Sequence, residues 1–312
     1  MLHRAFALTA LVVVLLTPGC GSDDAVQPAE TAATTSGAAA FPVTIEAENG
    51  SVEIAQPPER IVSLSATATE TLFAIDADQQ LIAVDDQSNY PEEAPQTKLS
   101  GFQPNVEAIA GYEPDLVIAA FDPGELVSGL GRLDIPVLLY SAPKALEGAY
   151  EQMNALGDAT GHSEEAAELV ESMSDEIDAL VEEAAVAEGA TVYHELGPDF
   201  FSATSETFIG SVYTLLGLEN IADEAGGTAP DYPQLSAEYI LATDPDLIVL
   251  SDTKCCGESA KTVAKRPGWK SLTAVQEGNI VPADDDIASR WGPRTVDFVE
   301  LIAGAAVDLE GA

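Results

Sequence analysis

The chain has 312 residues, 46% of them hydrophobic, and its 53 acidic residues outnumber 12 Lys and Arg, which gives a net charge of −41 at pH 7. This length supports two lobes with well-packed cores. The charge excludes nucleic acid as a partner, because phosphate backbones are bound by basic surfaces. Such acidity favours solubility and suits a saline habitat, but it indicates nothing about the fold.

The first segment has the pattern of a secretory signal. A short N-terminal region that contains the basic residue Arg4 precedes an apolar stretch, residues 5–16. This stretch is too short to span a membrane in the mature protein. It ends at Thr17-Pro18-Gly19-Cys20, which resembles a bacterial lipobox, although Thr17 stands where that pattern has Leu. The resemblance implies that residues 1–20 are a lipoprotein signal peptide and that Cys20 carries the lipid. A plain secretory peptide with an incidental Cys is the alternative.

Residues 21–40 are expected to form a flexible tether. They consist of Ala, Thr, Ser, Gly, Pro and acids without periodicity, a composition that cannot build a core. A lipid anchor on such a tether lets a protein reach a membrane partner without spanning the membrane. Because Arg4 is the one charged residue in residues 1–20, the chain without them has a net charge of −42.

The next region alternates strand and helix patterns. Apolar residues alternate on both sides of Asn49-Gly50, which predicts a hairpin. A helix is expected from Ser65 to about Ile75, and strands are expected at 61–64, 81–84, 115–120 and 135–140. Alternating β and α elements predict a mostly parallel sheet, and we assign residues 41–143 to an N-terminal lobe.

Two helices are expected to follow. The first covers residues 144–159 and ends at Gly161; the second begins with Ser163 as N-cap and two acids in its first turn. The apolar residues of the second helix follow an i, i+3, i+4 stripe: Ala166, Val170, Met173, Ile177, Leu180 and Ala184. At about 1.5 Å per residue, residues 163–188 span roughly 39 Å. We assign residues 144–189 to a stiff helical linker, which predicts small movements of the lobes.

The C-terminal lobe, residues 190–312, repeats part of the N-terminal one. Residues 103–118 and 234–249 share a helix-capping residue, a short helix, Pro-Asp and an apolar strand at a constant offset of 131 positions. A cleft between two similar lobes is a common place for a small ligand. The sequence therefore predicts an α/β protein with two Rossmann-like lobes of mostly parallel sheet, joined by a long rigid helix, with a ligand cleft between them.

Several motifs follow one another in order through the globular part, at residues 58–64, 69–74, 88–91, 104–107, 113–117, 232–236 and 266–269. Together they resemble the helical-backbone class of substrate-binding lipoproteins of ABC importers, which carry cobalamin, ferric siderophores and haem. The segment 284–294 is similar to the cobalamin-binding branch. The resemblance implies a monomeric, extracytoplasmic protein that captures a metal chelate and delivers it to a dimeric permease. A corrinoid is the favoured cargo, and a ferric siderophore or haem is the alternative.

The resemblance also implies which residues meet the cargo. In this family the cleft is lined by loops at the C-terminal ends of the strands, as the general rule for open α/β sheets suggests. In the cobalamin-binding branch an Asp and an Arg four residues later reach the corrinoid, here Asp286 and Arg290. Aromatic faces pack on a flat macrocycle, while Asp and Arg meet its amide rim. The expected ligand-binding residues are Gln87, Phe102, Phe121, Phe200, Phe201, Tyr232, Asp286, Arg290 and Trp291.

This chain departs from that branch at Gln87, Phe102 and Tyr232, where the branch typically has Tyr, Trp and Trp. The cleft is therefore expected to be aromatic but less bulky. Ordinary core packing is the alternative for each single aromatic residue. For Arg290 the alternative is an ion pair with Asp284 or Asp285.

One acidic residue in each repeat has a second implied role. In the family, one acid on the outer surface of each lobe docks onto arginines of the permease, and Glu107 and Glu238 hold that place here. The alternative is that each carboxylate only stabilises its helix N-terminus, by about 0.3–1 kcal/mol.

Three further features leave alternatives open. His194 is a candidate axial ligand for iron or cobalt, although a partly buried histidine with satisfied partners is favoured. The run Asp284–Asp286 could hold calcium, but it lacks the spaced ligands of known loops, which favours a solvated turn. Cys255 and Cys256 are adjacent, about 3.8 Å apart at Cα against the usual roughly 4.4–6.8 Å of a disulfide. They form a strained vicinal disulfide, two free thiols or a soft-metal site.

Enzymatic activity is not expected. The sequence has no Gly-x-Ser-x-Gly elbow, no His-Glu-x-x-His and no phosphate loop. After residue 20 the only histidines are His162 and His194. We expect a binding protein without a resident cofactor or metal; a secreted hydrolase and a structural lipoprotein are the competing hypotheses.

Overall fold

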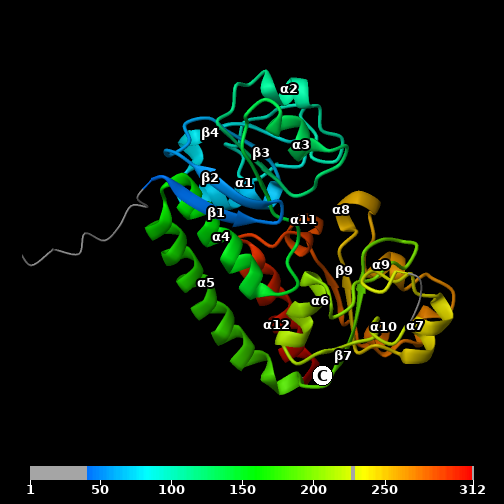
Figure 1. Ribbon diagram of the computed structural model, residues 1–312. Coiled ribbons are helices and arrows are strands. Elements are labelled where there is room, and N and C mark those ends of the chain that lie inside the picture. The colour runs from blue at the N-terminus through cyan, green and yellow to red at the C-terminus, as the bar shows by residue number, and fades with distance from the viewer. Residues whose placement is uncertain (1–40, 226–228, 311–312) are drawn as a thin grey trace, which may run out of the picture. The chain divides into compact units, whose positions relative to one another are not determined.

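The computed structural model describes residues 41–225 and 229–310. The predicted signal peptide, the tether and Cys20 lie outside the described residues. The described part contains two four-stranded sheets and one two-stranded hairpin, and long helices accompany both sheets (Figure 1). The predicted α/β class with two lobes of parallel sheet is confirmed.

The sheet of the N-terminal lobe has the order β4-β3-β5-β6, and all its strands are parallel: β4 (Leu81–Val84), β3 (Ile61–Leu64), β5 (Leu116–Ala119) and β6 (Val137–Leu139). Its strands are apolar except for Ser63, because helices cover them. The helices are α1 (Ala66–Ala74), α2 (Val106–Ala110) and α3 (Leu126–Gly131). The predicted hairpin is β1 (Val43–Ala47) with β2 (Gly50–Ile54), and its Glu48 N–H donates to the Leu139 carbonyl at 3.1 Å. This bond ties the hairpin to the sheet.

The second sheet has the order β10-β9-β7-β8, again all parallel: β10 (Ile280–Pro282), β9 (Leu247–Leu250), β7 (Thr191–Glu195) and β8 (Glu219–Asn220). Its helices are α6 (Phe208–Leu215), α7 (Ala237–Thr243), α8 (Thr253–Cys256), α9 (Ala260–Val263), α10 (Thr273–Glu277), α11 (Asp285–Ser289) and α12 (Thr295–Glu310).

The repeat seen in the sequence is also a repeat of strand register. Ile61 pairs with Leu116 in the N-terminal lobe. The residues 131 positions later, Val192 and Leu247, pair with each other in the C-terminal lobe. The predicted caps are present, since the Asn105 and Ser236 side chains accept N–H groups at the starts of α2 and α7. The two lobes are therefore copies of one α/β arrangement.

Two long helices, α4 (Leu146–Thr160) and α5 (Ser163–Ala184), connect the sheets in the sequence. The prediction of Ser163 as N-cap is wrong, because His162 holds that position and Ser163 is already helical. The predicted apolar stripe is confirmed: Ala166 packs in the core of the N-terminal lobe, while Met173 and Ile177 pack in the core of the other lobe. One helix of 22 residues, about 33 Å long, thus belongs to both cores. The residue boundaries assigned to the lobes and linker stay predictions.

Candidate functional site

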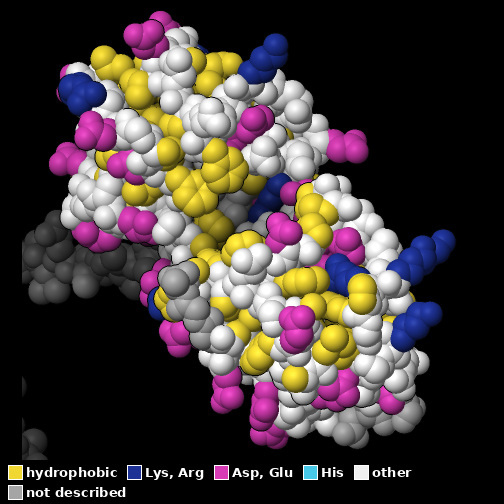
Figure 2. Space-filling model, turned by 90° about the vertical axis from the view of Figure 1, so that its right-hand side faces the viewer, with side chains coloured by type: hydrophobic (Ala, Val, Ile, Leu, Met, Phe, Trp, Pro, Cys, Tyr) yellow, Lys and Arg dark blue, Asp and Glu magenta, His cyan; other side chains and the backbone are white. Residues whose placement is uncertain are grey.

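A cleft of about 230 Å³ opens at the C-terminal ends of β3, β4 and β5 and is bounded on its other side by α11 and the residues after it. This is the edge of a parallel sheet at which ligands generally bind. Figure 2 shows a hollow with hydrophobic side chains and a basic side chain inside it. Six of the nine predicted ligand-binding residues line the cleft: Gln87, Phe102, Phe121, Asp286, Arg290 and Trp291.

The other three predicted residues do not line this cleft. The Phe200 ring stacks on Trp269 with centroids 5.7 Å apart, and Phe201 and Tyr232 are each 42% exposed. Their contact with a ligand stays a prediction. A larger groove, of about 540 Å³, lies beside α6 and α7, but it contains none of the nine predicted residues and is lined mainly by polar and acidic side chains.

Two phenylalanines form a flat apolar surface at the cleft. Phe102 and Phe121 stack with ring centroids 5.2 Å apart and an angle of 27°, yet they are 60% and 44% exposed. Large aromatic rings in an exposed patch are typical of binding sites. Trp291 is half-buried nearby, and its indole N–H donates to the Gln152 amide oxygen at 2.8 Å.

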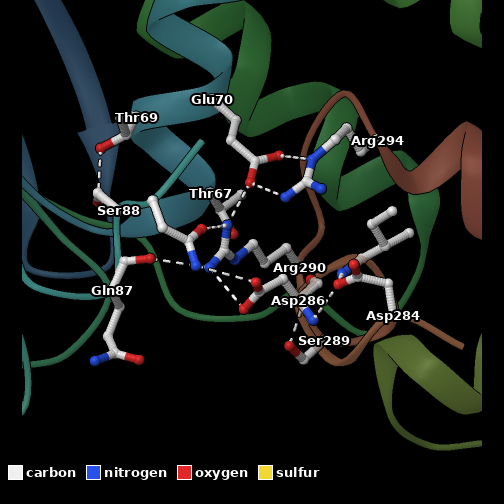
Figure 3. A network of polar contacts seen from close by, with 12 residues as sticks. Thr67, Thr69, Glu70, Gln87, Ser88, Asp284, Asp286, Ser289, Arg290 and Arg294 are labelled. Atoms are coloured by element: carbon white, nitrogen blue, oxygen red, sulfur yellow. Dashed lines mark hydrogen bonds and ion pairs between the residues drawn. The ribbon is translucent and has the colours of Figure 1, made fainter. Parts of the chain in front are cut away.

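Arg290 lies in a buried network that crosses between the lobes (Figure 3). Its Nη1 donates to Glu70 Oε1 at 2.6 Å and to Asn89 Oδ1 at 3.0 Å. Its Nη2 donates to the Gln87 carbonyl and to Asp286 Oδ1, both at 2.9 Å. The alternative partners Asp284 and Asp285 are therefore wrong. Within residues 41–225 and 229–310, Nε is the one guanidinium nitrogen of Arg290 left for a ligand.

Glu70 is a site residue that the sequence reasoning missed. Its carboxylate, with 1% of the side chain exposed, also accepts from Arg294 Nε at 2.9 Å and Nη2 at 2.5 Å. The hydrogen bonds and the charge of Glu70 raise the pKa of Arg294. The Arg294 guanidinium lies 4.2 Å from the centroid of the Tyr90 ring. The only indication that Glu70 belongs to the site is its position among the otherwise uncharged buried residues of α1.

Each acid of the 284–286 run has its own protein partners. Asp284 caps α11 by accepting from the Asp286 N–H at 2.9 Å, and Asp285 accepts N–H groups from α8. Burial acts to raise the pKa of Asp286, but hydrogen bonds from Lys254 and Asn89 and the charge of Arg290 hold it below its usual value. The described residues contain no group of three or more His, Cys, Asp or Glu that could hold a metal ion.

His194 is a core residue of the C-terminal lobe. It is fully buried, with Nδ1 2.5 Å from the Tyr213 hydroxyl and Nε2 2.9 Å from Ser251 Oγ. Burial lowers its pKa to about 3. The favoured hypothesis of a histidine with satisfied partners is thus confirmed, and both ring nitrogens are occupied.

A second buried charge cluster lies at the C-terminal ends of β7 and β9. Glu195 receives two hydrogen bonds of 2.6 Å from Arg266, and Arg266 also pairs with Glu258 at 2.8 Å. Asp252 is fully buried beside them, and neither of its oxygens has a partner among the described residues. Burial, and then the charges of Glu195 and Glu258, raise its pKa to about 7. The sequence carried no signal for this burial.

The two repeated glutamates occupy equivalent exposed positions. Glu107 and Glu238 are each the second residue of a short helix, α2 and α7. This placement agrees with dipole stabilisation and leaves both carboxylates accessible to a partner.

Cys255 and Cys256 form a vicinal disulfide at the exposed end of α8. Of the three alternatives left by the sequence, a vicinal disulfide, two free thiols or a soft-metal site, the structure has the vicinal disulfide. No helix within residues 41–225 and 229–310 combines the length and the apolar character needed to cross a membrane.

Comparison with known proteins gives consistent results. A family model described as periplasmic binding protein matches residues 61–287. The cobalamin-binding protein of Halobacterium salinarum (strain ATCC 29341 / DSM 671 / R1) is 31% identical over 317 residues, covering 97% of this chain and 85% of the relative. The uncharacterized ABC transporter substrate-binding lipoprotein YvrC of Bacillus subtilis (strain 168) is 29% identical over 304 residues, covering 94% and 93%. The crystal structure of the periplasmic vitamin B12 binding protein BtuF of Vibrio cholerae has a TM-score of 0.69 at 25% identity, covering 82% of this chain and 99% of that one.

Proposed function

This chain belongs to the periplasmic binding protein family, and from that premise we propose that it is the lipid-anchored substrate-binding component of an ABC importer for a corrinoid. The family match and the similarity to a substrate-binding lipoprotein support the importer role and an extracytoplasmic location. The lipid on Cys20 and the two-fold symmetric permease belong to the proposal. The family is a solute-binding class, so the protein captures and delivers its cargo.

The observation that carries the choice of cargo is the Phe102–Phe121 surface beside a fixed carboxylate. The two stacked rings offer an exposed flat apolar face to a planar macrocycle. Protein donors orient both oxygens of Asp286, and a carboxylate held in this way can accept amide N–H groups from the rim of a corrinoid, which supports the proposal. The similarity to a cobalamin-binding protein across 97% of this chain supports the same choice. Haem is less well supported, because His194 has no ring nitrogen free for its iron.

A ligand titration of the mature protein tests this proposal. Cyanocobalamin, haemin and several ferric siderophores are added separately, and thermal unfolding and visible absorbance are recorded. A ligand at 100 times its Kd stabilises the folded protein by about 2.7 kcal/mol, which gives a clear shift in Tm. A shift with cyanocobalamin alone supports a corrinoid cargo. A shift with only a ferric chelate or haemin would overturn the corrinoid assignment and leave the importer role intact.

A matched pair of variants tests the aromatic surface. Phe102→Ala with Phe121→Ala should weaken cyanocobalamin binding about tenfold or more, since each stacking contact contributes about 0.5–1.5 kcal/mol. Leu133→Ala, which removes another exposed apolar side chain of the same lobe, should leave the Kd unchanged. Equal affinities in the two variants would contradict a ligand role for the phenylalanines.

Docking on the permease is proposed for Glu107 and Glu238. Their equivalent exposed places in the two lobes suit a partner with two-fold symmetry. Glu107→Ala with Glu238→Ala should leave cargo affinity unchanged and reduce uptake by cells that carry the permease. The control variant Glu92→Ala with Glu300→Ala removes two other exposed acids and should transport normally. Normal uptake by the first variant would disprove the docking role.

A further inference from the structure

The helix α8 is a single turn that cannot be stable by itself, because helix nucleation costs more than one turn of hydrogen bonds returns. Asp285 supports its start by accepting the N–H groups of Thr253 at 2.8 Å, Lys254 at 3.0 Å and Cys255 at 2.9 Å. The vicinal disulfide between Cys255 and Cys256 closes its end. The segment is therefore a small rigid unit built on one side chain of α11 and one covalent bond.

This unit presents one long side chain toward α11. The Lys254 ammonium lies 2.7 Å from Asp284 Oδ1 and 3.0 Å from Asp286 Oδ2. Burial acts to lower the pKa of Lys254, but the hydrogen bonds to the two carboxylates raise it above its usual value. As an exposed ion pair this contact contributes little to stability. Lys254 pairs with Asp286, which lines the cleft, and this contact indicates a role in the binding site.

Asp286 is held by donors from both lobes. Its Oδ1 accepts from Arg290 at 2.9 Å, while its Oδ2 accepts from Lys254 and, at 3.1 Å, from Asn89 of the N-terminal lobe. Arg290 is itself fixed by Glu70 and the Gln87 carbonyl. Lys254 is the one of these three donors that depends on a one-turn helix.

We propose that Lys254 is a positioning residue of the cleft, that it orients Asp286 toward the cargo, and that the Cys255–Cys256 disulfide holds it in place. Lys254 acts through Asp286 and does not need to touch the cargo. The part of this inference that concerns affinity rests on the proposed function, whereas the orientation of α11 by Lys254 does not depend on any cargo.

A small dithiol such as dithiothreitol provides a reversible perturbation. Two electrons and two protons pass from the dithiol to the protein, the Cys255–Cys256 bond breaks to give two thiols, and the reagent becomes a cyclic disulfide. The end of α8 then loses its covalent closure, and the proposal expects Lys254, still paired with Asp284 and Asp286, to become more mobile.

Hydrogen exchange in the mature protein without ligand tests the orienting role. Amide exchange in residues 284–290, which include the Asp286 and Ile287 N–H groups capped by Asp284, should become several-fold faster in Lys254→Gln and in the reduced wild-type protein. Lys261→Gln, which changes an exposed lysine of α9, should exchange as the wild type does. Unchanged exchange in residues 284–290 of Lys254→Gln would overturn the proposal.

A double-mutant cycle with cyanocobalamin tests the consequence for affinity. Lys254→Gln should raise the Kd about three- to tenfold in the wild-type background and should have no effect in an Asp286→Asn background. Equal losses in both backgrounds would overturn positioning and assign Lys254 a direct contact. If the wild type binds no cyanocobalamin, the corrinoid assignment fails, and the exchange experiment still decides whether Lys254 orders α11.

Discussion

Replacing Glu70 by Gln tests whether the charge network at the cleft holds the protein together. Glu70 accepts hydrogen bonds from Arg290 and from two nitrogens of Arg294, with 1% of its side chain exposed. Gln keeps the shape of the side chain but removes the negative charge. It also turns an amide N–H group toward guanidinium donors, so that two largely buried cations lose their shared counter-charge.

The expected loss follows from this burial. Removing one partner of a buried ion pair typically costs about 3–5 kcal/mol, because the remaining charge stays desolvated. For a folded body of this size, each kcal/mol lowers the Tm by about 2–4 °C, so the loss should be roughly 10 °C. The same change removes one of the four partners of Arg290 and leaves Asn89, the Gln87 carbonyl and Asp286, and the weaker hold on Arg290 should also weaken cargo binding.

Equilibrium unfolding in urea, followed by the fluorescence of Trp269 and Trp291, measures the free energy of unfolding. Glu206→Gln is the matched control, because its ion pair with Lys144 at 3.4 Å joins side chains that are 74% and 73% exposed. That pair should contribute less than about 1 kcal/mol. If Glu70→Gln lost no more stability than Glu206→Gln, the reasoning from burial would be refuted.

The remaining predictions concern pH. His194 has a pKa of about 3 in the folded protein and about 6.5 in the unfolded chain. Between these pH values the unfolded chain binds one more proton than the folded protein. The free energy of unfolding should therefore fall as the pH drops from 6.5 to 3, by up to about 1.4 kcal/mol per pH unit. Urea titrations from pH 7 to 4 should show a shallower decline for His194→Gln; parallel curves would contradict this assignment. Asp252 has the opposite sign, since its folded pKa of about 7 exceeds the unfolded value of about 3.8, and its contribution to stability is lost as the pH rises through about 7. Asp252→Asn should therefore be more stable than the wild type at pH 8, and an equal or lower free energy of unfolding there would show that Asp252 has a partner when ionised.

The cleft residues were predicted from the resemblance to a known family, and the rule that ligands bind at strand ends accounts for only part of them. Gln87 and Phe121 follow the predicted strands 81–84 and 115–120, and the carboxyl ends of parallel strands meet at one edge, whereas Phe102 follows no predicted strand. Phe200, Phe201 and Tyr232 were expected in the same cleft from the resemblance but do not line it. Which loops meet depends on how the lobes pack, and no local pattern specifies that.

The sequence by itself determined the repeating elements of this protein. The 131-residue offset, the caps Asn105 and Ser236 and the stripe of α5 follow from period, capping and burial, which act over a few residues. Only the tertiary structure decided the partners of the charged residues. Arg290 and Glu70 are 220 positions apart, and Asp252 is fully buried without a hydrogen-bond partner among the described residues. Burial and ion pairing depend on residues that are distant in the chain. For this reason the local sequence around an acidic residue does not distinguish a solvated turn, a helix cap and a buried charge.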